Sequence, residues 1–134
     1  MKTAVLPLDP PPAKRALRVL YADDVPELRH LTQLSLARDD HIVECVDDGE
    51  EALAKISAAP DAYDVLITDH HMPRMTGLTL VQRLAEFPAF KGKIIIFSSS
   101  LSPEVDAAYR QHKVAHMLKK PLFPSVLREL LAKI

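Results

Sequence analysis

Cysteine is nearly absent from this chain, and its scarcity excludes two kinds of stabilising site. Cys45 is the only cysteine, so the chain can form neither an internal disulfide nor a zinc site built from several cysteines. A single free thiol fits a reducing compartment. We therefore expect a cytoplasmic protein.

An excess of charge of one sign is absent as well. Lys and Arg together number 17 and Asp and Glu number 18, which gives a net charge of -1. Nucleic acid and anionic membranes are usually bound by strongly basic surfaces. The balance of charges therefore gives no electrostatic case for either as the main partner.

Long hydrophobic runs are also lacking. No apolar run approaches the length needed to cross a membrane. Near the start, Lys2 and the short run Ala4-Val5-Leu6 are followed at once by Pro7, too early for the apolar region of a secretory signal. We expect neither a membrane span nor a cleaved leader.

The chain does have enough apolar residues for one core. It has 134 residues, of which 48% are hydrophobic, and this suits a single domain. Four prolines between Pro7 and Pro12 interrupt any helix or strand pattern near the start. We interpret residues 1–16 as a proline-rich flexible arm and residues 17–134 as the folded domain.

Apolar runs typical of buried strands alternate with helical patterns along the domain. The runs are separated by roughly 20 to 25 residues, enough for a crossover helix each time. Continuous apolar runs of this kind are typical of parallel strands that helices cover on both faces. We expect an α/β fold, (βα)5, with strands at 17–22, 41–46, 65–68, 94–97 and 115–118.

The helices between these strands have their own signals. Pro26 can open the first, with Leu28, Leu31, Leu34 and Ser35 on one side, and Ser102-Pro103 is typical of a helix start. Ala52, Leu53 and Ile56 mark the second helix, and Leu78, Val81 and Leu84 mark the third. The last helix has an apolar stripe formed by Phe123, Val126, Leu127, Leu130 and Leu131.

Polar residues stand at the ends of four of the five expected strands. Asp23-Asp24 follows the first, Asp69 ends the third, Ser98 to Ser100 follow the fourth, and Lys120-Pro121 follows the fifth. Carboxyl ends of parallel strands share one edge, where open α/β sheets bind ligands. Three carboxylates together indicate a cation, of which Mg²⁺ is the natural candidate, while lysine and serine suit a phosphoryl group. The pattern indicates phosphoryl transfer to Asp69.

With these motifs in place, the chain resembles a receiver domain of the two-component response-regulator family. The motifs that carry the resemblance are Leu20 to Asp24, Tyr63 to Asp69, Met72 to Gly77, Ile94 to Ser98, and Lys120-Pro121. The resemblance covers nearly the whole chain from about Leu17. It implies a doubly wound flavodoxin-like fold with a five-stranded parallel sheet in the order 2-1-3-4-5, an order for which a chemotaxis receiver is a known example.

The resemblance also implies roles for individual residues. Asp69 would accept phosphate from a phosphohistidine on a sensor histidine kinase or a histidine phosphotransfer protein. Asp23, Asp24, Asp69 and the main-chain carbonyl of His71 would bind Mg²⁺, Lys120 would form an ion pair near the acyl phosphate, and Ser98, or less favourably Ser99, would contact a phosphoryl oxygen. At the strand-five position of the usual switch aromatic this chain has Met117.

The family further implies a signalling domain that catalyses only its own phosphorylation and dephosphorylation. Its output surface would be helix four, strand five and helix five, where a partner protein or a second copy could dock. Because the sequence ends with its fifth expected helix, we expect a stand-alone receiver.

Several alternatives stand beside this interpretation. Asp23-Asp24 could cap the first helix, Ser98 to Ser100 could be an ordinary turn, and His70-His71 could suggest a transition metal, although no further Cys/His cluster supports it. A pseudo-receiver would bind a partner without phosphorylation. An aspartyl phosphatase would want a second acid soon after Asp69, and a flavin site would be repelled by Asp23-Asp24.

Overall fold

The computed structural model describes residues 16–134. The proline-rich arm expected over residues 1–16 therefore lies, apart from its last residue, outside the described part of the chain. The sequence interpretation of the arm stays a prediction.

The described residues form a five-stranded parallel sheet in the order β2-β1-β3-β4-β5. This confirms the expected fold class and the expected strand order. The strand bounds, all within one or two residues of the predicted runs, are β1 Arg18–Ala22, β2 Ile42–Val46, β3 Val65–Thr68, β4 Lys93–Ser98 and β5 His116–Lys119.

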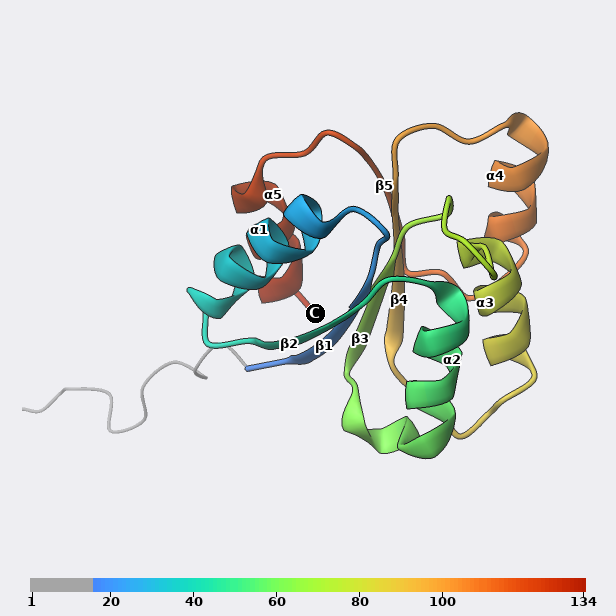
Figure 1. Cartoon of the computed structure of the whole chain (residues 1–134), viewed down its shortest axis with the longest axis horizontal. Coiled ribbons are helices and arrows are strands. Elements are labelled where there is room, and N and C mark those ends of the chain that lie inside the picture. The colour runs from blue at the N-terminus through green and yellow to red at the C-terminus, as the bar shows by residue number, and fades with distance from the viewer. Residues whose placement is uncertain (1–15) are drawn as a thin grey trace, which may run out of the picture.

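Helices cover both faces of the sheet, as Figure 1 shows: α1 and α5 lie on one side, and α2, α3 and α4 lie on the other. Their bounds are α1 Pro26–Ala37, α2 Gly49–Ala58, α3 Gly77–Ala85, α4 Pro103–Arg110 and α5 Pro124–Ala132, with a short 3-10 helix η1 at Pro60–Ala62. This arrangement explains why the central strands are apolar on both faces.

The core divides into two layers because successive strand residues point to opposite faces. In β3, Val65 and Ile67 belong to the layer under α1 and α5, whereas Leu66 belongs to the layer under α2, α3 and α4. The residues at the carboxyl ends of the strands lie beyond these two layers, next to the loops that follow the strands.

Local capping matches the sequence signals. Ser102 accepts a hydrogen bond from the Val105 amide at 3.2 Å at the start of α4, with Pro103 in the first turn, as predicted. Helix α1 begins at Pro26, and its N-cap residue Val25 makes no side-chain capping bond within the described chain. Asp23 and Asp24 are therefore not the cap of α1.

The sides of α1 and α5 that face the core differ from what the leucine pattern suggested. Leu31 is 47% exposed and Leu34 is 56% exposed, whereas Ser35, from the same expected side, is buried together with Thr32 and Leu36. The buried serine satisfies its hydroxyl by donating to the Leu31 carbonyl at 2.8 Å, so polarity does not prevent its burial.

The apolar stripe of α5 is also only partly buried. Leu127 and Leu131 lie in the core, but Phe123 is 79% exposed because it precedes the first turn, and Val126 is 41% exposed. Apolar side chains are thus left on the surface at the start of α5.

Candidate functional site

The loops that follow β1, β3, β4 and β5 meet at one edge of the sheet, the upper edge in Figure 1. Strand register sets the spacing, since Ala22 pairs with Thr68 and each is followed by an aspartate. The amide of Asp69 donates to the Ala22 carbonyl at 2.9 Å, which continues the ladder by one step. Asp23 and Asp69, 46 positions apart in sequence (69 minus 23), are therefore neighbours.

Three carboxylates gather at this edge. Oxygen atoms of Asp23, Asp24 and Asp69 lie within 4.8 Å of one another. Asp23 is fully buried and Asp69 is 6% exposed, whereas Asp24 is open to solvent. Negative charges this close and this buried repel one another unless a cation is near.

Lys120 supplies a positive charge to this cluster from the end of β5. Its Nζ lies 2.7 Å from Asp23 Oδ2 and 3.1 Å from Asp69 Oδ2. The side chain is 13% exposed, so solvent screens the contact only weakly. The lysine therefore holds the two buried carboxylates together.

Two further groups orient Asp23, and the sequence analysis did not identify either. The Tyr21 hydroxyl donates to Asp23 Oδ2 at 2.8 Å, and the Arg29 guanidinium donates to the Asp23 carbonyl at 2.7 Å. Burial, followed by the neighbouring Asp23 carboxylate, raises the pKa of Tyr21 well above its usual range, so the hydroxyl stays a donor. The available signal was a tyrosine two positions before Asp23, on the same face of the strand and next to aliphatic residues.

Ser98 and Ser99, which the sequence left as alternatives, occupy different environments. Ser98 is the last residue of β4 and is 3% exposed, whereas Ser99 is exposed. Among residues 16–134, the Ser98 hydroxyl is the one buried polar side-chain atom without a hydrogen-bond partner. An unsatisfied buried hydroxyl is costly unless it serves a ligand, so the geometry favours Ser98 over Ser99.

The histidines that follow Asp69 point to different surroundings. His71 is exposed, and its Nε2 lies 3.2 Å from the Ser100 carbonyl. His70 is buried, and its Nδ1 lies 2.7 Å from the Tyr109 hydroxyl of α4.

Met117 lies half-buried on β5, against the same core layer as Tyr109.

The donor set at this edge fits Mg²⁺ well. Carboxylate oxygens are the ligands that this ion prefers, and it commonly takes one or two of them while keeping several waters. Among the described residues, Asp23, Asp24 and Asp69 form the one acidic or histidine cluster with metal-ligand spacing, and its exposed member leaves a side open to water. His70 and His71 do not join it.

A family model, the response regulator receiver domain, matches residues 19–132 of the chain. The chain belongs to the response regulator receiver family. It is thus a receiver domain of two-component signalling, and the resemblance found in the sequence is confirmed.

Individual relatives agree with this assignment. The chain is 34% identical over 117 residues to the chemotaxis protein CheY1 of Helicobacter pylori, covering 84% of this chain and 92% of that one. It is 32% identical over 129 residues to the sensor histidine kinase AruS of Pseudomonas aeruginosa, covering 92% of this chain. The structure of Vibrio cholerae chemotaxis protein CheY4 superposes with a TM-score of 0.79 at 30% identity, covering 90% of this chain and 99% of that one.

The relatives differ greatly in length. The chain spans nearly all of CheY1 but only 12 to 17% of several other curated relatives that it matches. Receiver domains therefore occur both alone and within long proteins.

No helix within residues 16–134 is long and apolar enough to cross a membrane.

Proposed function

We propose that Asp69 is the residue of this receiver that accepts phosphate, and that the donor is a phosphohistidine of a sensor histidine kinase or of a histidine phosphotransfer protein. The observation that carries the proposal is the placement of Asp69. Its carboxylate lies at the carboxyl edge of β3, beside Asp23 and Asp24 and 3.1 Å from Lys120 Nζ. The Asp69 nucleophile, the neighbouring carboxylates and the Lys120 ammonium group can thereby all contact the same phosphoryl group.

The transfer itself needs few protein groups. An oxygen of Asp69 attacks phosphorus, an O–P bond forms, and the P–N bond breaks with its electron pair returning to the imidazole nitrogen. The product is an acyl phosphate, which water later hydrolyses. Because the transferred group carries its charge on peripheral oxygens, catalysis consists mainly of positioning and charge stabilisation.

The residues around Asp69 can meet these requirements. Lys120 is close enough to pair with a phosphoryl oxygen, and the unpartnered Ser98 hydroxyl can donate to another. Asp23, Asp24, Asp69 and the main-chain carbonyl of His71 would hold Mg²⁺. When bound, the ion neutralises charge on both the carboxylates and the phosphoryl oxygens.

Phosphorylation of Asp69 can be tested with acetyl phosphate and Mg²⁺, followed by intact-protein mass spectrometry. We expect one added phosphoryl group in the wild type and none in Asp69→Asn. Asp61→Asn, an exposed substitution in η1, is the matched control and should label as the wild type does. Labelling retained in Asp69→Asn would contradict the assignment, and an unlabelled wild type would favour the pseudo-receiver.

Mg²⁺ dependence provides a separate test of the acidic cluster. Chelation of divalent ions should abolish labelling of the wild type, and Asp24→Asn should require more Mg²⁺ for the same rate. Because Asp24 is exposed, its substitution should leave the fold intact. Labelling that ignores chelation would argue against the metal site.

We further propose that the folded receiver spans residues 17–134, that its own phosphorylation and dephosphorylation are its only chemistry, and that its output surface is α4, β5 and α5. The exposed Phe123 and Val126 at the start of α5 support docking there, either of a target or of a second copy. Gel filtration with and without beryllofluoride tests self-association. An unchanged elution volume would leave a different protein as the partner.

A further inference from the structure

A buried hydrogen bond joins the phosphoacceptor segment to α4. His70 directly follows Asp69, and its Nδ1 lies 2.7 Å from the hydroxyl of Tyr109, which is 39 positions further along the chain. Tyr109 is fully buried and His70 is 9% exposed. The two rings meet edge to face with their centroids 5.6 Å apart. The pair therefore has a defined geometry that solvent does not disturb.

The main chain of His70 is tied to the carboxylate of Asp69. The His70 amide donates to Asp69 Oδ1 at 2.7 Å, and the His70 carbonyl accepts from the Gly77 amide at 3.0 Å. The same residue thus orients the carboxylate through its backbone and contacts α4 through its ring. A change in the charge or hydrogen bonding of the Asp69 carboxylate therefore alters the hydrogen bond made by the His70 amide.

Space around this contact is tight. A Cβ atom added to Gly77 would lie 2.3 Å from the Asp69 carbonyl oxygen and 2.7 Å from the Tyr109 hydroxyl. The start of α3 therefore packs directly against both groups, and glycine is favoured there because any side chain would have to displace a main-chain carbonyl and the Tyr109 hydroxyl. Tyr109 cannot drift away from His70 while α4 keeps its position.

Burial favours the neutral form of both members of the pair. Burial lowers the pKa of His70, with a further decrease from His71, and burial raises the pKa of Tyr109 above its usual range. A hydrogen bond between neutral groups in the core is worth little overall, but loss of one partner leaves the other unsatisfied at a much larger cost. The bond therefore favours structures in which α4 and the Asp69 segment keep their relative position.

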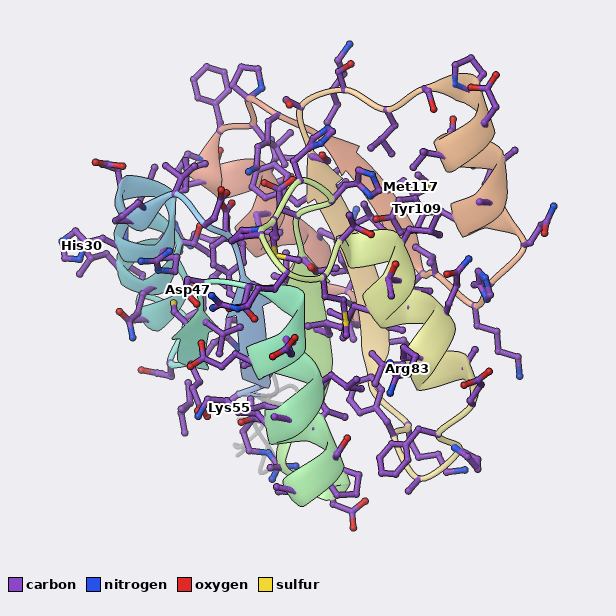
Figure 2. The ribbon with its side chains drawn as sticks, turned by 45° about the vertical axis from the view of Figure 1, so that its right-hand side comes forward. His30, Asp47, Lys55, Arg83, Tyr109 and Met117 are labelled. Carbon is purple, nitrogen blue, oxygen red and sulfur yellow. The ribbon has the colours of Figure 1, made fainter. Side chains whose placement is uncertain are left out.

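Strand β5 has no aromatic ring on this side of the sheet. Met117 is flexible and has no hydroxyl, and it packs against the layer that contains Tyr109. Figure 2 shows both labelled side chains on the side of the sheet covered by α3 and α4. A buried aromatic ring with a hydroxyl is thus provided by α4 and not by β5.

We propose that Tyr109 is a positioning residue that couples Asp69 to α4 through His70, so that phosphorylation reaches the output surface through α4 and does not depend on an aromatic residue of β5. The inference rests on the proposed phosphorylation of Asp69. A simpler role for Tyr109 as a core residue would require its ring but not its hydroxyl, and this difference makes the inference testable.

The decisive variant is Tyr109→Phe, which removes only the hydroxyl. Tyr63→Phe is its matched control, because the Tyr63 hydroxyl also donates a 2.7 Å hydrogen bond, to Glu44 Oε1, but lies away from the site. Amide chemical shifts measured with and without Mg²⁺ and beryllofluoride report on Asp69 and α4 separately. In the wild type and in Tyr63→Phe we expect shifts in both regions; in Tyr109→Phe we expect the Asp69 shifts to remain and most of the α4 shifts to be lost.

A second variant guards against a folding defect. If Tyr109→Phe loses amide dispersion, the double variant His70→Leu, Tyr109→Phe removes both polar partners, which is far less costly than leaving one unpaired. It should fold, respond at Asp69 and fail to respond in α4. An α4 response in either folded variant equal to that of the wild type overturns the coupling. A wild type that shows no change near Asp69 overturns both the coupling and the proposed function.

Discussion

Strands β3 and β5 are equally long and belong to the same sheet, yet their environments differ sharply. All four residues of β3 are buried, whereas β5 has two half-buried residues between two exposed ones. β3 lies between β1 and β4, while β5 is an edge strand that pairs with β4 alone. Asp69 follows the buried strand and Lys120 follows the edge strand, so the site joins a fully buried strand to a partly exposed one.

This difference separates two tasks. A nucleophile benefits from a fixed position, because small misplacements are costly in rate. A surface that reports phosphorylation must instead have more than one accessible arrangement, and such regions come from the less stable parts of a fold. The variants below test this contrast, beginning with the largest expected effect.

Truncation of one side chain on each strand measures the contrast directly. Ile67 on β3 is fully buried and Leu118 on β5 is half-buried, and both contact the layer under α1 and α5. Ile67→Ala should lower the free energy of unfolding by about 4 kcal/mol, and Leu118→Ala by roughly half of that. Urea denaturation provides both values. Equal losses would mean that β5 is as firmly packed as β3.

Removal of Lys120 breaks the link between the two strands. Lys120→Met leaves Asp23 and Asp69 buried without their cation, which should lower stability by about 3 kcal/mol when divalent ions are chelated. Saturating Mg²⁺ should recover much of this loss, because the ion replaces the missing positive charge. Urea denaturation with EDTA and with Mg²⁺ tests this. The same loss in both conditions would show that the carboxylates do not bind the ion.

Substitution of Tyr21 tests the part of the site around Asp23 while Lys120 is kept. Tyr21→Phe removes the hydroxyl that donates to Asp23 and should lower stability by about 1.5 kcal/mol. The apparent affinity for Mg²⁺ should fall by about tenfold, because the carboxylate loses part of its orientation. Calorimetric titration gives the affinity, and Tyr63→Phe is the matched control. An unchanged affinity would limit Tyr21 to a packing role.

The smallest expected effect concerns β2, the other edge strand, and the pH dependence of stability. His41 immediately precedes β2, and its Nδ1 accepts a 2.9 Å hydrogen bond from the Leu17 amide. Burial lowers the pKa of His41 below its usual 6.5 in the folded state. As the pH falls below 6.5, His41 is therefore protonated more readily in the unfolded chain than in the folded one, and the free energy of unfolding decreases.

His41→Asn keeps a hydrogen-bond acceptor but cannot titrate in this range. As the pH falls from neutral to below 6.5, the unfolding midpoint of the variant should therefore decrease less than the wild-type midpoint does. Thermal melts over this range provide the comparison. Parallel pH profiles would exclude His41 as a source of the dependence.

Features fixed by strand periodicity were predictable from the sequence. The five strands and the convergence of Asp23, Asp24, Asp69 and Lys120 follow from apolar runs that end in polar residues, whereas the strand order came from the resemblance to the receiver family. Each of these features depends on which residues end a strand and not on how side chains pack.

Features set by packing between distant elements were not predictable. The pattern of α1 suggested a buried side with Leu31, Leu34 and Ser35, but of these only Ser35 is buried, and the unpredicted Thr32 lies in the core beside it. The contact between His70 and Tyr109 depends on the distance between α4 and the loop after β3, which no periodicity encodes. A pair of adjacent histidines in the sequence does not reveal that one is buried and the other exposed.

Gly77 has a consequence for how this chain can diverge. Because an added Cβ would collide with the main-chain carbonyl of residue 69 and with the side-chain hydroxyl of residue 109, a larger residue at position 77 requires the backbone after β3 to shift and the side chain at 109 to make room. The choice of residue at position 77 is therefore constrained by the side chain at 109 and by the path of the backbone after β3. Homologues with a larger residue at 77 should have a smaller one at 109, together with a shifted backbone after β3.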